Sequence, residues 1–307
     1  MGELLFGLNI HPGADNAELA FRLASLADEH ALDFVSVMDH PEQPRFLESW
    51  TLLVALAMRT RRVAVMPNVA SIPLRPPAML AKAASSLALL TGGRVILGIG
   101  AGAPTVVGPY GGPVRDPGEA VDAVAEAVAV IRGVWDTQRE RVSVQGRHYR
   151  LADARPGPHP PAPIPLWIGS FGPRLLRLTG RVADGWAPTN RYADPTQIAR
   201  TRHHVDQGAE QAGRDPRSLR RNYNVMGAID PQAAAQDGKL LVGGVDAWVT
   251  ALGRYHRELG FDSFVFWPVH GDELAQSRLF ASEVVPQLRE LTNPTPPAGS
   301  SSGRSDR

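Results

Sequence analysis

Short apolar runs alternate with longer amphipathic segments along most of this 307-residue chain. Eight mainly apolar runs predict buried strands, and they cover residues 4–10, 34–38, 63–66, 94–99, 166–169, 184–188, 219–229 and 261–267. Apolar residues at helical spacing predict the helices between them, which cover residues 15–30, 48–59, 76–90, 118–136, 173–181, 195–213, 246–260 and 273–291. This repeat predicts parallel strand pairing and an α/β fold, a closed (β/α)8 TIM barrel.

Three irregular segments interrupt the repeat. Residues 100–117 form a loop rich in Gly and Pro, and the pattern over 142–149 predicts a hairpin. Residues 156–165 are rich in proline and must be irregular. We therefore expect one barrel domain over residues 1–292 with an insertion region, followed by a disordered tail rich in Pro, Ser and Gly over 293–307.

A doubly wound sheet is the main alternative fold. The segment 98–103, GIGAGA, resembles a dinucleotide-binding fingerprint with alanine in the third position. That fingerprint requires a helix that begins at once, whereas Pro104 and a long loop follow here. No acidic residue ends a strand at the required distance. The barrel is therefore favoured over a dinucleotide-binding sheet.

The composition excludes several classes of function. A net charge of +1 gives no long-range field that would attract nucleic acid. The absence of cysteine excludes disulfides, thiolate zinc sites and cysteine nucleophiles. No apolar run reaches membrane-spanning length, and the first residues carry no signal-peptide pattern. We expect a cytoplasmic protein that contacts neither nucleic acid nor membrane.

Polar side chains with catalytic potential end the first two predicted strands. His11 follows the first strand, and Asp39 and His40 close the second. Strand C-termini of a barrel converge on the face that carries the active site. Histidine titrates near neutrality, so His40 and His11 are candidate proton donors, although a structural hydrogen bond would also account for either one. These three residues could also bind a metal ion, but no helical His-x-x-x-His pair or paired carboxylate supports such a site. We therefore predict no metal.

The fifth strand, residues 166–169, is followed by Ser170-Phe171-Gly172, with Pro173 at the first helical position. Free backbone N–H groups and the helix dipole favour an anion at such a helix start. We therefore predict that these three residues bind a cofactor phosphate, with an ordinary strand-to-helix turn as the alternative. At other strand ends, Trp186 and Trp267 either wall a pocket for a planar ring or fill the barrel rim.

Three segments together resemble the bacterial luciferase-like family of flavin- or deazaflavin-dependent oxidoreductases. They are DFVSVMDHP, then PNVASIPLRPPAMLAKAASSLALLTGGRVILGIGAGA, then PIPLWIGSFGPRLLRLTGRVADGW. The resemblance extends over about residues 4–291 and implies a (β/α)8 barrel with an insertion region. It also implies a homodimer.

The resemblance also implies roles for individual residues. A non-proline cis peptide after the third strand backs the cofactor ring in the family, and here it would join Asn68 to Val69, with Ser71 nearby. Asp39 matches a ring contact, and His40 matches a histidine near the reacting carbon. Ser170, Phe171 and Gly172 match the loop that binds the cofactor phosphate.

One departure from the family pattern concerns the substrate. Relatives that oxidise sugar phosphates carry a glutamate and an asparagine in the loop after the fourth strand. Ala103 and Val106 stand at those places here, which argues against a sugar phosphate. The small, apolar loop suits a less polar small-molecule substrate.

The resemblance therefore implies an oxidoreductase that uses the deazaflavin coenzyme F420 and moves hydride to or from an organic substrate, with reduction of a C=C or C=N bond favoured. An FMN-dependent monooxygenase that receives reduced flavin from a separate reductase is the first alternative. A flavin-binding protein without catalysis is the second, although the intact polar residues at the strand ends argue against it.

Overall fold

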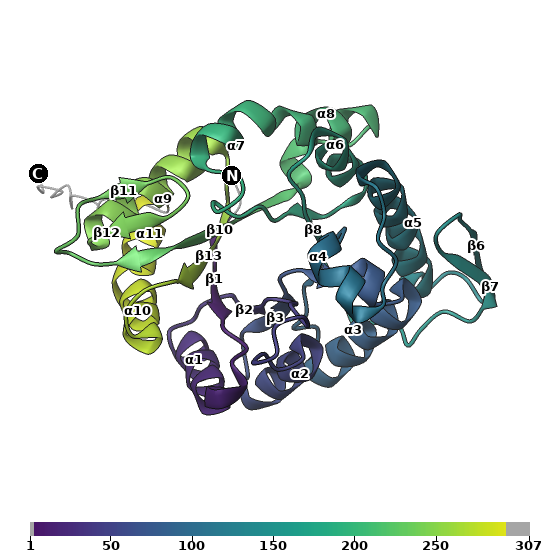
Figure 1. The fold of residues 1–307 in the computed structure, drawn as a ribbon, viewed down its shortest axis with the longest axis horizontal. Helices are drawn as coiled ribbons and strands as arrows, with labels where there is room; N and C mark the ends of the chain where they lie inside the picture. Colours follow the sequence, from purple (N-terminus) through teal and green to yellow (C-terminus); the bar gives the residue numbers. More distant parts are fainter. Residues whose placement is uncertain (1–2, 293–307) are drawn as a thin grey trace, which may run out of the picture.

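The computed structural model describes residues 3–292, and these form the predicted barrel (Figure 1). All pairings along the strand order β3-β2-β1-β13-β10-β9-β8-β5-β4 are parallel. The barrel strands are β1 (Leu5–Ile10), β2 (Phe34–Val37), β3 (Ala64–Pro67), β4 (Ala70–Ser71), β5 (Leu97–Gly100), β8 (Leu166–Gly169), β9 (Gly185–Trp186), β10 (Arg220–Ile229) and β13 (Ser263–Pro268). The predicted tail over 293–307 lies outside the described residues.

β3 and β4 follow one another along the same place in the barrel wall. Both pair with the chain over residues 94–100, which includes β5, and this pairing closes the barrel. In the lower part, Val65 N donates to Arg94 O at 3.1 Å, and Ile96 N donates to Val65 O at 3.0 Å. In the upper part, Ala70 pairs with Ile99. Asn68 and Val69, between β3 and β4, therefore interrupt what would otherwise be one continuous strand.

Eleven helices accompany the barrel strands within the described residues. They are α1 (Ala17–Glu29), α2 (Ser49–Arg59), α3 (Pro77–Thr91), α4 (Pro104–Val107), α5 (Pro117–Trp135), α6 (Pro173–Val182), α7 (Pro195–Thr201), α8 (His203–Gln211), α9 (Val245–Leu259), α10 (Glu273–Leu279) and α11 (Val285–Thr292). Several begin at a side chain that accepts a hydrogen bond from a backbone N–H of the first turn: Asn16, Glu48, Asp116, Asp194 and Asp272.

Four details differ from the expected element pattern. The helix expected over 195–213 divides at Arg202, whose carbonyl accepts from Val205 N in a tighter i to i+3 turn. A π-helical turn over 280–284 separates α10 from α11. The loop after β5 contains the short α4, and a small hairpin, β11 (Gln236–Asp237) and β12 (Leu241–Gly243), follows β10. Hydrophobic spacing alone does not locate such short elements.

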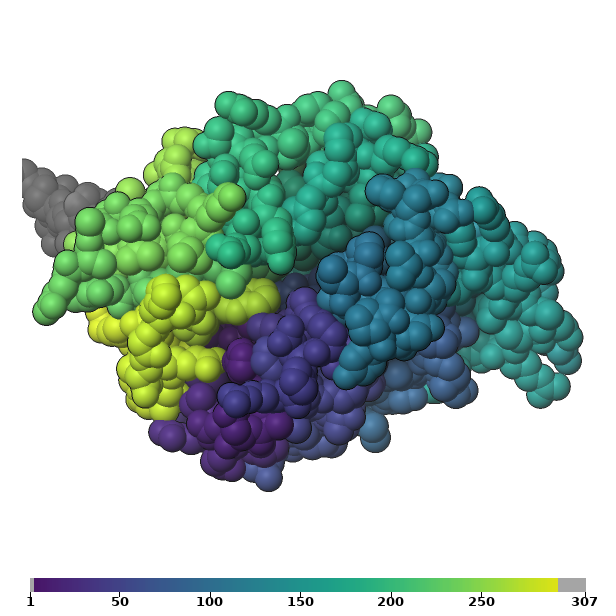
Figure 2. All heavy atoms as spheres, viewed as in Figure 1, coloured from purple at the N-terminus to yellow at the C-terminus, as the bar shows by residue number. Residues whose placement is uncertain are grey.

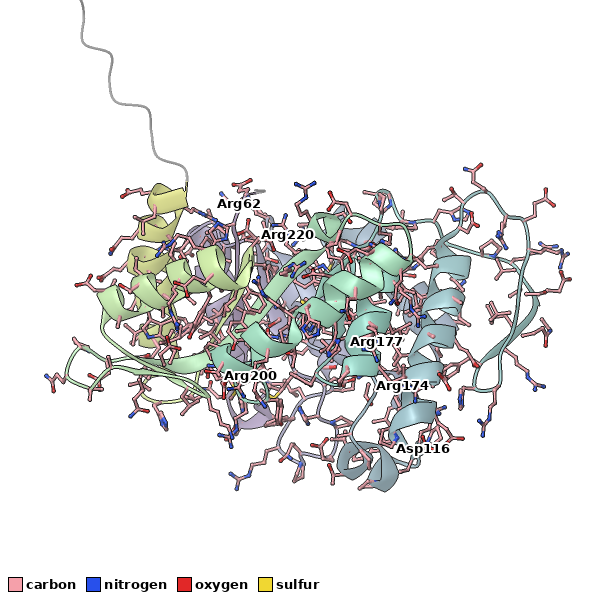
Figure 3. All side chains as sticks on the ribbon, turned by 90° about the horizontal axis from the view of Figure 1, so that it is seen from above. Arg62, Asp116, Arg174, Arg177, Arg200 and Arg220 are labelled. Atoms are coloured by element: carbon pink, nitrogen blue, oxygen red, sulfur yellow. The ribbon has the colours of Figure 1, made fainter. Side chains whose placement is uncertain are left out.

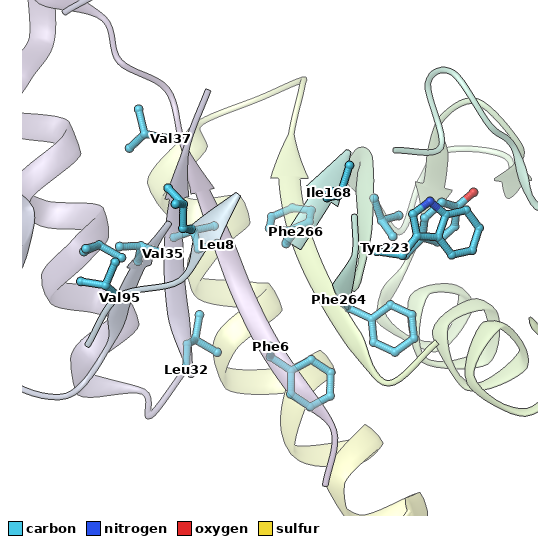
Figure 4. Close-up of a cluster of buried hydrophobic side chains, with 14 of the residues drawn as sticks. Phe6, Leu8, Leu32, Val35, Val37, Val95, Ile168, Tyr223, Phe264 and Phe266 are labelled. Atoms are coloured by element: carbon cyan, nitrogen blue, oxygen red, sulfur yellow. The ribbon is translucent and has the colours of Figure 1, made fainter. Parts of the chain in front are cut away.

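Apolar side chains alternate between the two sides of the barrel strands. The outward side chains Phe6, Leu8, Val35, Phe264 and Phe266 are buried beneath the helices (Figure 4). This alternation is the expected consequence of the two-residue period of a strand. It leaves the barrel interior to a separate set of residues.

Aromatic residues fill the lower interior of the barrel. Phe34 and Trp167 meet edge to face, with ring centroids 5.6 Å apart. Each ring occupies space where another strand has glycine, since a Cβ at Gly7 would lie 2.6 Å from Phe34 and one at Gly185 would lie 2.5 Å from Trp167. The barrel is thus a packed core at this end.

The insertion region lies outside the barrel, beyond α5 (Figures 1 and 2). Its hairpin consists of β6 (Val142–Gln145) and β7 (Arg150–Ala154). Glu126 on α5 accepts bonds from the backbone N–H groups of Arg147, His148 and Tyr149 at 2.9, 2.7 and 2.9 Å. This one carboxylate fixes the hairpin turn on the helix. No helix in the described part of the chain is long and apolar enough to cross a membrane.

α6 is held against α8 by two glycines. A Cβ at Gly180 would lie 2.0 Å from Val205 O, and one at Gly208 would lie 2.0 Å from Arg177 O. The helix backbones therefore approach more closely than any larger side chain permits. This contact sets the position of α6, whose first residues reach the candidate site.

Gly208→Ala should lower the free energy of unfolding by about 1–3 kcal/mol, because the methyl group overpacks the α6–α8 contact. Urea denaturation measures this difference. Gly172→Ala is a matched control on α6, since its Cβ meets nothing within 4 Å and its φ is −82°. Equal stability of the two variants would show that the close approach is not required.

Candidate functional site

A row of buried polar side chains crosses the barrel above the aromatic layer. Ser36 Oγ donates to Asn9 Oδ1 at 3.1 Å, and Asn68 Nδ2 lies 3.3 Å from Ser36 Oγ. The same Asn68 nitrogen donates to Asn224 Oδ1 at 2.6 Å, and Asn224 Nδ2 donates to Pro188 O at 3.0 Å. All four polar side chains are buried. We call Asn9, Ser36, Asn68 and Asn224 the amide layer.

The Asn68–Val69 peptide bond is cis, which confirms the position that the family resemblance implied. Val69 projects over three glycines on neighbouring strands. A Cβ would lie 2.7 Å from the Val69 side chain at Gly100, 3.1 Å at Gly169 and 3.2 Å at Gly98. The glycines that resembled a dinucleotide fingerprint thus make room for Val69.

A cavity of about 340 Å³ lies at the C-terminal ends of the strands. The described residues that line it are Asp39, His40, Asn68, Val69, Ser71, Gly100, Ala101, Gly102, Ala103, Val106, Gly169, Phe171, Leu175, Ala187, Thr189, Tyr192, Asn224 and Trp267. Most of the predicted site residues are among them. Ala103 and Val106 both line the cavity, so the apolar loop identified from the sequence forms part of its wall.

Asp39 is the best-connected polar side chain of the site. Its carboxylate accepts two bonds of 2.8 Å from Arg75, one of 2.9 Å from Ser49 Oγ and one of 3.0 Å from Ser71 N. Arg75 also pairs with Glu48. Burial acts to raise the pKa of Asp39, but the hydrogen bonds and charge of Arg75 outweigh it and hold the pKa below its usual value. Asp39 lines the cavity, but hydrogen bonds to protein groups already use most of the accepting capacity of its carboxylate.

The two candidate histidines lie in different surroundings. His40 lines the cavity, and its Nδ1 lies 2.8 Å from Glu42 Oε1. The His11 ring packs edge to face on Phe46, with centroids 4.7 Å apart, and His11 is not among the described residues that line the cavity. Burial lowers the pKa of His11, with partial compensation from Asp15. The structure thus brings only His40 to the cavity.

The three residues predicted to bind the cofactor phosphate, Ser170, Phe171 and Gly172, also lie in different surroundings. The Ser170 hydroxyl is buried and bonded to Thr179 Oγ1 at 2.9 Å, away from the cavity. Phe171 lines the cavity and is 40% exposed. Gly172 is the N-cap of α6, and the space beside its Cα is open. Arg174 follows in the first turn, on the outer surface (Figure 3).

The two tryptophans also have different roles. Trp267 lines the cavity. Trp186 is fully buried and stacks on Phe261, with centroids 5.7 Å apart, so of the two alternatives for this residue it has the one of filling the interior. Its place at the mouth is taken by Phe171 and Tyr192, whose rings meet at 5.5 Å. Tyr192 lies beyond the sixth strand, where the hydrophobic pattern carries no signal for it.

Asp39→Asn should lower the free energy of unfolding at neutral pH by about 3 kcal/mol, the lower end of the range for a broken buried ion pair. Because the folded-state pKa of Asp39 is depressed, its ionisation stabilises the fold above about pH 4, and this contribution is lost as the pH falls through the folded-state value. Urea unfolding from pH 7 to pH 2.5 should therefore be less pH-dependent in Asp39→Asn.

Glu210→Gln serves as the control, because Glu210 lies on the exposed side of α8, where loss of a carboxylate should change stability by less than about 1 kcal/mol. Parallel acid profiles for the wild type and Asp39→Asn would contradict the depressed pKa.

Comparison with known proteins identifies relatives on both sequence and fold. The chain is 37% identical over 175 residues to the phthiodiolone/phenolphthiodiolone dimycocerosates ketoreductase of Mycobacterium tuberculosis, a match that covers 56% of this chain and 45% of the relative. It is 31% identical over 223 residues to the F420-dependent glucose-6-phosphate dehydrogenase of Nakamurella multipartita, covering 70% of this chain and 65% of the relative. The chain thus matches about half the length of the ketoreductase and about two thirds of the dehydrogenase.

Solved structures share the fold at lower identity. An F420-dependent secondary alcohol dehydrogenase in complex with an F420-acetone adduct superposes with a TM-score of 0.85 and 20% identity, covering 94% of this chain and 99% of the other. The oxygenating constituent of 3,6-diketocamphane monooxygenase from Pseudomonas putida, in complex with FMN, gives 0.73 and 18%, with coverages of 93% and 98%. The family model described as luciferase-like monooxygenase matches residues 5–261. The chain therefore belongs to the luciferase-like family.

Proposed function

We propose that this protein is an F420-dependent oxidoreductase that exchanges a hydride with a small, mainly apolar organic substrate. The observation that carries the proposal is the cavity, in which His40 is a titratable side chain facing walls of Ala103, Val106, Phe171 and Leu175. The F420-dependent dehydrogenase among the relatives supports the choice of cofactor.

The described residues fit a planar ring with an anionic tail. Val69 and the glycines beneath it give the cavity a floor without long side chains. Ser71 Oγ is buried at the cavity with no partner among the described residues, so it has a hydrogen bond to offer. The start of α6 at Gly172 presents free backbone N–H groups that suit a phosphate. Asn68, Val69 and Ser71 would hold the ring, and Phe171 and Gly172 would adjoin the tail.

When bound, F420 supplies a deazaflavin ring that accepts or donates a hydride. His40 then gives a proton to the substrate, or takes one from it, on the cavity side of its ring. The apolar walls keep water from the reacting atoms and favour a substrate of low polarity. Asp39 and Arg75 hold the backbone at Ser71 and so keep the rim of the cavity in place.

The substrate class follows from the wall of the cavity. A sugar phosphate needs polar partners, and the loop positions at Ala103 and Val106 offer none. Reduction of a C=C or C=N bond suits this wall. A ketoreductase and a secondary alcohol dehydrogenase are among the similar proteins. Ketones and secondary alcohols are therefore further candidate substrates.

An FMN-dependent monooxygenase is the second candidate, supported by the FMN complex among the structural neighbours. It would require reduced flavin from a separate reductase. The homodimer implied by the family resemblance stays a prediction, which sedimentation of the purified protein tests.

Titration with F420 and with FMN, followed by fluorescence, should show saturable binding of F420 only. Gly172→Asp should weaken F420 binding by on the order of tenfold, because a carboxylate at the helix N-terminus competes with the phosphate. Gly172→Asn is the matched neutral control, and both side chains enter open space. Saturable binding of FMN alone would favour the monooxygenase, and equal F420 affinity of the two variants would place the phosphate elsewhere.

His40→Ala should keep F420 affinity and lower turnover by about 10²–10⁴-fold, the range for a lost general acid or base. Single-turnover rates of His40→Ala, His40→Gln and His11→Ala test this assignment. His11→Ala should turn over at nearly the wild-type rate, because His11 is not among the described residues that line the cavity. Wild-type rates in both His40 variants, with a loss in His11→Ala, would transfer the role to His11.

A further inference from the structure

A tight turn places Glu42 beside His40. Gln43 N donates to His40 O at 3.1 Å, which closes a four-residue turn with Pro41 at its second position. Proline presets the backbone angle that this position requires. The turn brings the side chains of its first and third residues together, and His40 Nδ1 lies 2.8 Å from Glu42 Oε1. Their pairing thus follows from the local chain and needs no distant contact.

Glu42 is more than a solvated surface carboxylate. Its side chain is 17% exposed, against 44% for His40. Its second oxygen, Oε2, is buried with no hydrogen-bond partner among the described residues. Burial acts to raise the pKa of Glu42, but the hydrogen bond with His40 helps to hold that pKa below its usual value. A carboxylate that stays ionised while partly buried, and bonded to a cavity histidine, is typical of functional sites.

The pairing decides which imidazole nitrogen carries the proton. A carboxylate accepts but does not donate, so neutral His40 must carry its proton on Nδ1 to bond with Glu42. The lone pair of Nε2 is then free on the side of the ring away from Glu42. In neutral histidine the hydrogen bond at one nitrogen determines the state of the other.

We propose that Glu42 is a positioning residue, which fixes the proton of His40 on Nδ1 so that Nε2 is the atom that exchanges a proton with the substrate. The proposal rests on the proposed function. With an alcohol as substrate, Nε2 would take the hydroxyl proton while the carbon gives up its hydride to an oxidised deazaflavin ring, and the C=O bond would form. In the reduction, the hydride would come from the reduced ring and the proton from Nε2 of the imidazolium form of His40, which would then be left neutral with its remaining proton on Nδ1.

Other carboxylates of the site are engaged elsewhere. Both oxygens of Asp39 accept bonds from Arg75. Glu48 pairs with the same arginine and accepts from Thr51 N at 2.7 Å at the start of α2. Among the described residues, the one hydrogen bond of the His40 ring is to Glu42. Glu42 is therefore the group that determines the orientation of this ring.

The tautomer of His40 tests the proposal without cofactor or substrate. In the ¹⁵N-histidine-labelled apoprotein at alkaline pH, where an imidazole is neutral, long-range ¹H–¹⁵N spectra should show His40 protonated on Nδ1. Glu42→Ala should move the proton to Nε2 or give a mixture. Glu42→Gln should keep it on Nδ1, because the amide oxygen still accepts the bond.

Turnover provides the second measurement. Glu42→Ala should lower kcat by on the order of 10–100-fold, the range known for carboxylates that orient metal-bound imidazoles, with unchanged F420 affinity. Glu42→Gln should recover part of this loss. Glu210→Ala, on the exposed side of α8, is the control and should match the wild type in both measurements.

The two measurements separate the possible failures. His40 protonated on Nδ1 in Glu42→Ala would overturn the role of Glu42, whatever cofactor the protein binds. An unchanged kcat in Glu42→Ala, beside a large loss in His40→Ala, would also overturn it and leave the proposed function standing. If F420 does not bind, the proposed function fails, and the tautomer alone decides whether Glu42 fixes the His40 proton.

Discussion

The hydrogen bonds of the amide layer divide the barrel interior into two parts. Asn68 lies at its centre, since its Nδ2 contacts Ser36 on β2 and Asn224 on β10. Below the layer, the aromatic rings of Phe34 and Trp167 fill the barrel, so the site cannot extend downward. Buried amides are costly unless they are paired, and their mutual bonding fixes a single arrangement of the strands around them. The height of the cavity floor therefore depends on this layer.

The rim depends on a different interaction, the ion pair between Asp39 and Arg75. These residues lie 36 positions apart and are joined by two hydrogen bonds of 2.8 Å. Through Ser49 and the backbone of Ser71, the same carboxylate connects β2 to the start of α2 and to β4. The segment from Asn68 to Ser71 belongs to both the floor and the rim. The cis peptide bond therefore lies between Asn68, which is bonded to Asn224, and Ser71, which is bonded to Asp39.

Much of the fold, and part of the site, could be predicted from the sequence. Strand and helix positions follow from hydrophobic period, and the convergence of His40, Asn68 and Ser71 follows from barrel geometry. The part that could not be predicted depends on side-chain direction and on distant partners. Ser170 turns inward to Thr179, and Arg75 is recognisable only once β2 and β4 lie close together. Glu42 has a local signal in the sequence, the turn-forming His-Pro-Glu-Gln segment, which places it beside His40 without any distant contact.

Strand ends and loops both contribute to the lining of the cavity. Most polar atoms of the floor and the Asp39 rim are paired by hydrogen bonds, but Ser71 Oγ and Asn9 Nδ2 are buried with no partner among the described residues. Loops supply other parts of the cavity wall, with Ala103 and Val106 on one and Tyr192 on another. Loops tolerate substitution better than strands do, and they carry specificity on a constant scaffold. Cofactor geometry should therefore belong to the strand side, while exchanges at the loop positions change the substrate without disturbing the amide layer.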